Sequence, residues 1–220
     1  MKVIGLKDIK KIYGKKDYET VALQSIDLEI SEGESIAIMG TSGSGKSTLL
    51  NILGCLDTQT SGSYFFNGNS INTFKEKELA KLRNSSFGFI VQSFALIDDF
   101  TVYENVVIPL DYSKNKKKKS EVINLLKKLG IDEKINKTPK ELSGGQCQRV
   151  AIARALVNDP EVILADEPTG SLDGRTGQEI MNILLDLNKK GKTLIIVTHD
   201  LNIAKQCHRI VNIVDGKIIN

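Results

Sequence analysis

Residues 40–47 read Gly-Thr-Ser-Gly-Ser-Gly-Lys-Ser, a glycine-rich run of the kind that binds phosphate. Glycines let the backbone curl until its N–H groups point at phosphate oxygens, and a helix that begins at Lys46 turns its positive dipole end toward the same anion. The pattern predicts that Lys46 reaches the β- and γ-phosphates and that the Ser47 hydroxyl binds Mg²⁺. A chance match is the alternative, but an expected strand before the run and an expected helix after it favour phosphate binding.

Residues 162–167 form an apolar stretch that ends in two carboxylates, Asp166 and Glu167. A buried strand would deliver Asp166 to the Mg²⁺ site, directly or through water. Glu167, at the strand tip, could orient and deprotonate an attacking water. An exposed acidic turn would explain these residues equally well in isolation, but the phosphate loop in the same chain favours the catalytic interpretation.

Three single residues follow or end expected strands, and each has a commoner structural role before context is considered. His199 follows the strand at 194–198, where the ligand crevice of a parallel sheet lies, and it could bind the γ-phosphate or the attacking water. Gln92 follows the strand at 87–91, and its amide could ligate Mg²⁺ and sense the γ-phosphate. Tyr13 could stack on adenine. A helix cap, a surface amide and a packing aromatic are the respective alternatives.

Residues 142–146, Leu-Ser-Gly-Gly-Gln, form a second small polar loop before an expected helix at 145–157. Ser143 can cap that helix, and the following N–H groups make another helix N-terminus that attracts anions. One chain therefore contains two predicted anion sites, and two copies that close around a nucleotide would use both.

The elements that position these residues alternate between strands and helices. Apolar or alternating runs predict strands at 3–12, 21–30, 35–39, 63–66, 87–91, 162–165 and 193–198. Helical spacing predicts helices at 46–53, 75–83, 101–110, 120–129, 145–157, 176–190 and 201–206. This alternation favours an α/β fold with a mainly parallel sheet covered on both faces. Because strand signals are scarce between 98 and 159, that segment is predicted to be a helical subdomain, inserted in a core formed by 1–97 and 160–220 of one domain.

Composition excludes several classes of protein. The chain has 220 residues, 40% of them hydrophobic, with a net charge of +3, no tryptophan and 5% aromatic residues, so nucleic-acid binding is not expected. No apolar run approaches the ~20 residues of a membrane span, and the N-terminus lacks a signal-peptide pattern, which predicts a cytoplasmic location. Three scattered cysteines without metal-ligand spacing are expected to be reduced. The lysine-rich run at 114–119 is either a solvated connector or a contact with anionic lipid.

Together these motifs make the chain resemble the ATP-binding subunits of ABC transporters over essentially its whole length. Residues 40–47 resemble the Walker A motif, 142–146 the signature loop and 162–167 Walker B. Gln92 matches the Q-loop, 171–173 the D-loop, His199 the H-loop and Tyr13 the A-loop. The resemblance implies a P-loop ABC ATPase core with a mainly parallel sheet, an N-terminal antiparallel β part and an inserted helical subdomain.

The resemblance also implies the cofactors, ATP and Mg²⁺, and the residues that bind them. Catalytic roles fall on Lys46, Gln92, Glu167 and His199. The Mg²⁺ ligands are Ser47, Gln92 and Asp166. ATP is bound within one copy by Tyr13, Gly40, Thr41, Ser42, Gly43, Ser44, Gly45, Lys46, Ser47 and Thr48. A second copy contributes Ser143, Gly144, Gly145, Gln146 and Asp173.

Further segments narrow the resemblance to the subgroup that contains the macrolide exporter MacB, the lipoprotein-release ATPase LolD and the cell-division ATPase FtsE. These segments are 50–57, 60–62, Phe94 and 165–170. In that subgroup a small ATPase pairs with a separate or fused permease. Val91 replaces a common aromatic residue, and Cys147 replaces a second glutamine after the signature, which suggests a site sensitive to thiol reagents.

The mechanism implied by the resemblance joins two copies head to tail, with each ATP between Lys46 of one copy and Ser143 of the other. Gln92 and the helical insert would pass the motion to a permease, so the chain is expected on the inner face of the cell membrane. Export of peptide, antibiotic or lipid-linked substrates is favoured over import. The alternatives are an FtsE-like ATPase that drives an extracytoplasmic enzyme without transport, and a non-transport ABC ATPase acting on nucleic acid or ribosomes. The residues that distinguish an exporter from an FtsE-like ATPase are expected to lie in the permease.

Overall fold

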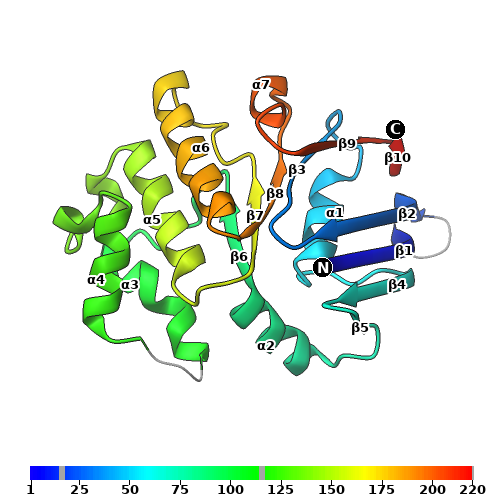
Figure 1. Cartoon of the computed structure of the whole chain (residues 1–220), viewed down its shortest axis with the longest axis horizontal. Helices are drawn as coiled ribbons and strands as arrows, with labels where there is room; N and C mark the ends of the chain where they lie inside the picture. The colour runs from blue at the N-terminus through cyan, green and yellow to red at the C-terminus, as the bar shows by residue number, and fades with distance from the viewer. Residues whose placement is uncertain (15–17, 114–116, 220) are drawn as a thin grey trace.

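The computed structural model describes residues 1–14, 18–113 and 117–219. Half of the lysine-rich run, residues 114–116, therefore lies outside the described residues. Within the described part, strands gather in two sheets, and helices cover the face of the larger sheet that lies away from the smaller one (Figure 1).

The larger sheet is six-stranded and mainly parallel, as the sequence predicts. Its strand order is β10-β9-β3-β8-β7-β6, and only the edge strand β10 runs antiparallel. The strands are β3 (Ser35–Met39), β6 (Phe87–Val91), β7 (Val162–Asp166), β8 (Thr193–Val197), β9 (Arg209–Val214) and β10 (Lys217–Ile219). The three central strands are short apolar runs because both of their faces are buried.

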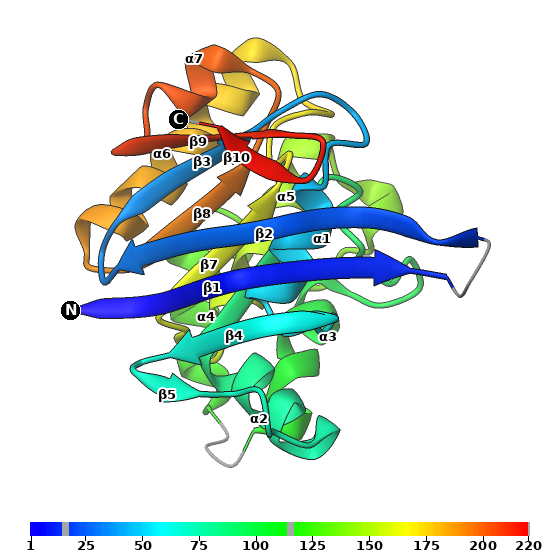
Figure 2. The same cartoon turned by 90° about the vertical axis from the view of Figure 1, so that its right-hand side faces the viewer.

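The smaller sheet is antiparallel, with the strand order β2-β1-β4-β5 (Figure 2). It consists of β1 (Lys2–Tyr13), β2 (Thr20–Ser31), β4 (Ser61–Phe66) and β5 (Asn69–Ser70). Burial alternates along β1 and β2, so one face of this sheet packs inward and the other faces solvent. Asn67 and Gly68 both have positive φ in the turn between β4 and β5, which is why an Asn-Gly pair suits this hairpin.

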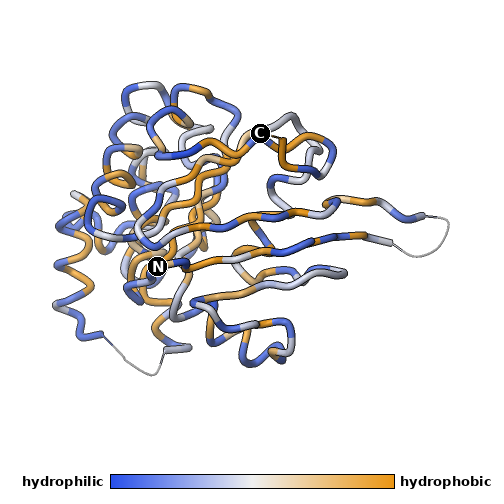
Figure 3. Tube along the Cα trace, turned by 45° about the vertical axis from the view of Figure 1, so that its right-hand side comes forward, coloured by the Kyte–Doolittle hydropathy of each residue, from blue (hydrophilic) through white to orange (hydrophobic). Residues whose placement is uncertain are grey.

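Two hydrophobic clusters divide the interior at the larger sheet. Along β7, Val162 and Leu164 belong to the cluster shared with the smaller sheet and α1 (Lys46–Leu53), whereas Ile163 and Ala165 belong to the cluster under the helices. Successive side chains of a strand point to opposite faces, which produces this division. Hydrophobic segments accordingly concentrate in the central strands (Figure 3).

In the described part of the chain, five helices lie beside the second cluster. Those within the predicted insert are α3 (Val102–Val107), α4 (Lys119–Lys128) and α5 (Gly144–Leu156), with the 3₁₀ turns η2 (Ile108–Tyr112), η3 (Asp132–Lys134) and η4 (Pro139–Glu141). Those that follow the insert are α6 (Gly174–Lys189) and α7 (Leu201–Ala204). A further helix, α2 (Glu76–Ser86), precedes β6. The described structure between residues 98 and 159 contains no strand, as the sequence predicts.

Two predicted helices are shorter in the structure. The helix expected at 101–110 ends at Val107 and continues as the 3₁₀ turn η2, because Pro109 has no N–H to donate to the α-helical ladder. The helix expected at 201–206 ends at Ala204. Neither change moves a candidate site residue, since the loop of residues 40–47 and the carboxyl ends of β6, β7 and β8 keep their predicted places.

Candidate functional site

A cavity of about 670 Å³ lies where the loop of residues 40–47 meets the carboxyl ends of β6, β7 and β8. Its volume is in the range of pockets that bind small molecules. Most of the predicted binding loop lines it, together with the chemical groups predicted from separate strands. These groups are Lys46, Ser47, Gln92, Asp166, Glu167 and His199.

The loop before α1 is shaped by glycine and leaves the helix N-terminus uncapped. Gly45, the N-cap residue, has a φ of 104°, and a Cβ there would lie 2.6 Å from the carbonyl oxygen of Ala22. No side chain of the described residues caps α1. The first N–H groups of the helix are therefore available to an anion in the cavity.

Lys46 lies across the mouth of this loop. Its Nζ donates hydrogen bonds to the carbonyl oxygens of Gly40, at 2.9 Å, and Thr41, at 2.7 Å. An ammonium group has three donors, so these two bonds fix its position and leave a third N–H for a phosphate oxygen. The backbone thus holds the cation at the place where the sequence predicts phosphate.

The predicted Mg²⁺ ligands come from three segments of the chain that lie far apart in sequence: the start of α1, the residue after β6 and the end of β7. Ser47 Oγ donates to Asp166 Oδ2 at 3.3 Å, and Gln92 lines the same cavity. Burial raises the pKa of Asp166; the hydrogen bond from Ser47 and the Lys46 charge oppose this, and the Glu167 charge adds to it. Mg²⁺ is usually bound through one or two carboxylates plus phosphate and water, which fits the half-buried carboxylate of Asp166 beside a hydroxyl.

Glu167 is the best-fixed side chain of the cavity. Its Oε1 accepts a hydrogen bond from the backbone N–H of His199 at 3.0 Å and lies 2.7 Å from His199 Nδ1. Its Oε2 lies 3.4 Å from the hydroxyl of Thr198, which donates to it. Glu167 also has a left-handed φ of 47°, a conformation that persists only where the surroundings hold it. A fixed, partly buried carboxylate at a cavity wall suits the predicted role of general base.

The residues predicted to act on a second copy's nucleotide gather elsewhere. Ser143 caps α5, with its Oγ accepting from the N–H of Gln146 at 3.3 Å, and the Gln146 side chain accepts from the Ser143 N–H at 2.9 Å. Gly145 packs against Thr176, in the first turn of the helix that Asp173 caps. The structure thus brings the Ser143 loop and Asp173 into one region, and none of them lines the cavity.

Two residues predicted to bind ATP do not line the cavity. Ser44 is buried, and its hydroxyl has no hydrogen-bond partner among the described residues. Tyr13 pairs with Thr20, which does line the cavity, but its hydroxyl donates to Asp57 at 2.6 Å. Lys11 lies 4.7 Å from the centre of the Tyr13 ring and also pairs with Asp57. Stacking of Tyr13 on adenine therefore stays a prediction.

Sequence reasoning missed several contributors to the site. Thr20, Val21 and Ala22 line the cavity from the start of β2. The signal was weak, because an exposed valine beside a turn is common, and Val21 is 50% exposed. Thr198 was also missed, since a threonine before a histidine carries no distinctive pattern. Its contact with Glu167 follows from the pairing of β7 with β8.

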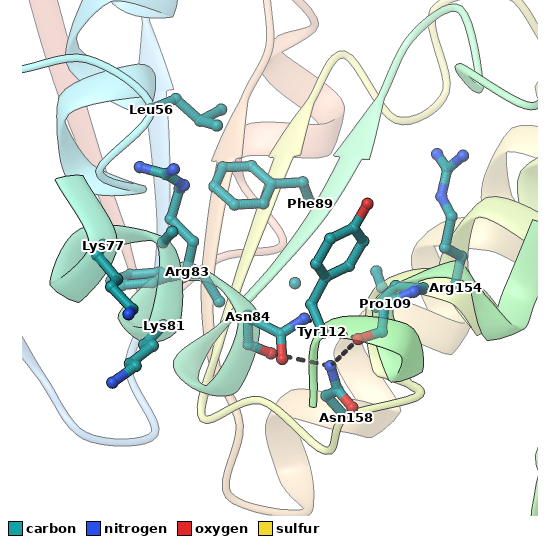
Figure 4. A pocket seen from close by; sticks show the side chains of 14 residues that line it. Leu56, Lys77, Lys81, Arg83, Asn84, Phe89, Pro109, Tyr112, Arg154 and Asn158 are labelled. Atoms are coloured by element: carbon teal, nitrogen blue, oxygen red, sulfur yellow. Dashed lines mark hydrogen bonds between the residues drawn. The ribbon is translucent and has the colours of Figure 1, made fainter. Parts of the chain in front are cut away.

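A second cavity, of about 520 Å³, lies between α2, β6, η2 and α5. We call it the lateral groove. Phe89 and Tyr112 form its centre, with Lys77 and Lys81 to one side and Arg154 to the other (Figure 4). Among the described residues that line it there are four cationic side chains and no carboxylate. The lateral groove is therefore apolar at its centre and positive at its edges.

Cys147 does not have the exposed, reactive thiol that a site sensitive to thiol reagents requires. Its side chain is buried, and its Sγ lies 3.7 Å from the carbonyl oxygen of Pro139. Burial raises the pKa of this thiol, and the Asp98 charge adds to the effect. Because the thiolate is the reactive form, the structure argues against easy modification of Cys147.

Comparison with known proteins gives a consistent picture. A family model described as ABC transporter matches residues 23–170. The chain is 46% identical over 219 residues to the macrolide export ATP-binding/permease protein MacB of Vibrio parahaemolyticus, covering 99% of this chain and 34% of that protein. The MacB protein of Escherichia coli is 45% identical over 220 residues, also with 34% of its length covered. The chain thus spans about a third of the length of these curated relatives.

Solved structures with the same fold include two cassettes. One is the dimeric post-hydrolysis state of the ATP-binding cassette MJ0796 bound to ADP and Pi, with a TM-score of 0.91, 43% identity and coverage of 99% of this chain and 97% of that one. The other is cbiO1 from Clostridium perfringens, with a TM-score of 0.86, 34% identity and coverage of 100% and 87%. In the described residues, no helix has the length and apolar character that a membrane crossing requires.

Proposed function

The chain belongs to the ABC transporter family, and on that basis we propose that it binds and hydrolyses ATP to power a membrane permease. One observation carries the proposal. Glu167, held by His199 and Thr198, faces the same cavity as Lys46, Ser47 and the glycine-rich loop. A general base and a phosphate-binding loop in one cavity are what nucleotide hydrolysis needs.

The chemistry follows from these positions. Glu167 orients a water molecule and accepts its proton as the water oxygen attacks the γ-phosphorus and the bond to ADP breaks. Lys46 and the N-terminal N–H groups of α1 stabilise the charge on the phosphate oxygens. Mg²⁺, held by Ser47, Asp166 and Gln92, would neutralise further phosphate charge. His199 keeps the Glu167 carboxylate in place and contributes a polar group near the γ-phosphate.

A second copy of the chain completes the proposed site. The Ser143 loop and Asp173 lie together but do not line the chain's own cavity, so they suit a nucleotide held by another copy. The cassette MJ0796 is dimeric in a state bound to ADP and Pi, which supports this arrangement by similarity. Opening after hydrolysis follows because the bridging phosphate is cleaved and the products repel each other.

The proposed permease contact is the lateral groove. Its apolar centre at Phe89 and Tyr112 and its edge lysines suit an amphipathic segment that carries acidic residues. Because α2, β6 and α5 all line the groove, movement of residues 98–159 relative to the core would alter its shape. On this basis the chain is a peripheral subunit at the inner face of the cell membrane, and the MacB relatives favour export.

The test is to purify a tagged Glu167→Gln variant from solubilised native membranes in ATP and identify its partners. Recovery of a permease with a large extracytoplasmic domain supports the proposal. Recovery of a wall enzyme with that permease, and no transported substrate, favours the FtsE-like alternative. Recovery of DNA or ribosomes without a membrane protein contradicts the permease, whereas absence of ATP hydrolysis by the unaltered chain contradicts the ATPase.

A further inference from the structure

Helix α5 contacts the two loops of the chain's own cavity that carry Gln92 and Glu167. Arg154, near its C-terminal end, donates hydrogen bonds to the carbonyl oxygens of Phe94 and Ala95. Gln148, one turn from its N-terminus, donates to the carbonyl oxygen of Pro168 at 2.7 Å, and Pro168 directly follows Glu167. The same helix begins at the Ser143 loop, which is proposed to bind another copy's nucleotide.

The Arg154 contact holds a segment that would not keep its shape unaided. Phe94 and Ala95 have left-handed φ values of 60° and 47°, and neither is a glycine. Such residues persist only where neighbouring groups determine their conformation. Phe94 also closes a turn onto the carbonyl oxygen of Val91, so this segment sets the position of Gln92 between them.

Arg154 has little else to bind. Within residues 1–14, 18–113 and 117–219 it makes no ion pair, and its side-chain hydrogen bonds go to these two carbonyl groups. Burial lowers the pKa of Arg154, as expected for a guanidinium largely removed from water. Its stem also lines the lateral groove (Figure 4). A planar fork that spans two successive carbonyl groups fixes orientation as well as distance.

Gln148 provides a second contact between α5 and the loops of the cavity, here the loop that follows Glu167. The side chain is fully buried, and within the described residues its one hydrogen bond goes to the carbonyl oxygen of the residue after Glu167. Glu167 itself has a left-handed φ, so the Pro168 carbonyl also lies in a constrained turn. Consequently a displacement of α5 along its axis would move both loops.

We propose that Arg154 is a positioning residue that ties the Gln92 loop to the Ser143 helix. Docking of Ser143 on another copy's nucleotide then sets Gln92 in the chain's own cavity, so that α5 links the two nucleotides of a dimer. This inference rests on the proposed ATPase function. ATP binding to the cavity alone does not involve Arg154, because Arg154 does not line that cavity.

Steady-state hydrolysis separates this role from a purely structural one. We expect Arg154→Met, which keeps the stem but removes both hydrogen bonds, to lower kcat roughly 10- to 100-fold, the loss associated with a misplaced catalytic group. The Kd for ATP, titrated with each substitution in a Glu167→Gln background, should not change. Arg154→Lys, which can still donate to one carbonyl, should recover part of kcat. The matched control is Arg149→Met, since Arg149 lies on the same helix but binds Leu129 and Glu179.

A fluorescent reporter tests the loop directly. The chain has no tryptophan, so Ser93→Trp places a single reporter beside Gln92 on an exposed residue. In a Glu167→Gln background, Mg-ATP at dimer-forming concentrations should change its emission. The change should survive Arg149→Met and be lost in Arg154→Met.

Each result decides the proposal. Normal kcat in Arg154→Met, or an equal loss in Arg149→Met, overturns it, as does an emission change that survives Arg154→Met. Thermal unfolding is measured for every variant. If Arg154→Met does not fold, Arg154→Lys is used in its place. A reduced kcat of Arg154→Lys at an unchanged Tm supports the proposal, and full activity of Arg154→Lys overturns it. If the unaltered chain does not hydrolyse ATP, the proposed function fails, and the reporter still tests the Arg154 contact.

Discussion

Residues 40–47 and residues 142–146 both place glycines ahead of a helix, but the two helix N-termini differ. The N-cap of α1 is Gly45, which offers no side chain to the helix N–H groups. The N-cap of α5 is Ser143, which forms a reciprocal capping box with Gln146. The first loop also has Lys46 and a surrounding cavity, whereas Ser143 is exposed.

The difference bears on the order of binding. Uncapped N–H groups in a cavity gain their first hydrogen bonds from an anion, so residues 40–47 can bind a nucleotide without help. At α5 an anion adds less, because one of the N–H groups already has an internal partner. The two loops therefore suit successive steps: nucleotide binding in one copy, then closure of a second copy onto it.

The largest expected effect comes from Glu167, the proposed general base, which lines the cavity and has no counterpart at the Ser143 loop. Glu167→Gln should slow ATP hydrolysis by about 10²–10⁴-fold, the range for removal of a general base, while ATP binding persists. Phosphate release gives the rate and a nucleotide titration gives the affinity. Glu161→Gln is a matched control, because Glu161 precedes the same strand at its opposite end and bonds Asn67. Near-normal turnover in Glu167→Gln would remove Glu167 from the role of base.

The next effect tests whether the first loop binds nucleotide independently. Lys46→Ala should raise the Kd for ATP roughly 10- to 100-fold, because a charge-assisted hydrogen bond to phosphate is lost. Calorimetric titration of the isolated chain measures it, with Lys189→Ala as the exposed control at the end of α6. An unchanged Kd would contradict the assignment of Lys46 to the phosphates.

How much of this site could be read from the sequence depends on how local each contact is. The run at 40–47 and the strand ending in Asp166 were predictable, because each is a short pattern with its own chemistry. The mainly parallel sheet was also predictable, since β3 and β6 have the bounds that their apolar runs indicate. Pro109 marks the break of the helix expected at 101–110, but the apolar spacing around it continues with helical period and hides the change to a 3₁₀ turn.

Contacts through backbone carbonyl groups could not be predicted. Arg154 and Gln148 bind main-chain oxygens of residues that lie 59 and 20 positions away, at Ala95 and Pro168. A carbonyl group is present at every residue, so no side-chain pattern marks the partner. The ion pair of Lys11 with Asp57 beneath Tyr13 could not be predicted either. It forms only when β1 and the segment after α1 pack together, and no pattern in the sequence indicates that packing.

A smaller effect sharpens the comparison at the second loop. Ser143→Ala should lower Tm by about 2–4 °C, because an N-cap contributes about 1 kcal/mol to a protein of this size. Thr101→Ala is the matched control, since Thr101 forms the same capping box with Glu104 on α3. Both variants should lose similar stability. Only Ser143→Ala should weaken ATP-dependent dimerisation of the Glu167→Gln chain in analytical ultracentrifugation, and equal dimerisation would contradict a nucleotide contact at Ser143.

The smallest effect concerns how the two regions respond to pH. Burial raises the pKa of Asp166 in the cavity, whereas the hydrogen bond from Lys137, together with the Thr138 N–H, lowers the pKa of Glu141, before the Ser143 loop, to about 2. The folded state thus binds a proton at Asp166 more readily than the unfolded chain does. That stabilisation is complete below the ordinary pKa of 3.8 and is lost as pH rises through the folded value.

Asp166→Asn should therefore raise Tm at neutral pH, and the gain should shrink as pH falls below the folded pKa of Asp166. Glu141→Gln should do the opposite, because a lowered pKa stabilises the fold above the ordinary value of 4.5, and this is lost as pH falls toward about 2. Thermal unfolding of both variants from acid to neutral pH measures the two signs. The opposite outcome is a Tm for Asp166→Asn at or below that of the parent at neutral pH. It would mean that the interactions of the carboxylate with Ser47 and Lys46 stabilise the fold by more than the burial of its charge destabilises it. The cavity would then be organised around a charged Asp166 before any metal binds, and the two regions would no longer differ in the sign of their response to pH.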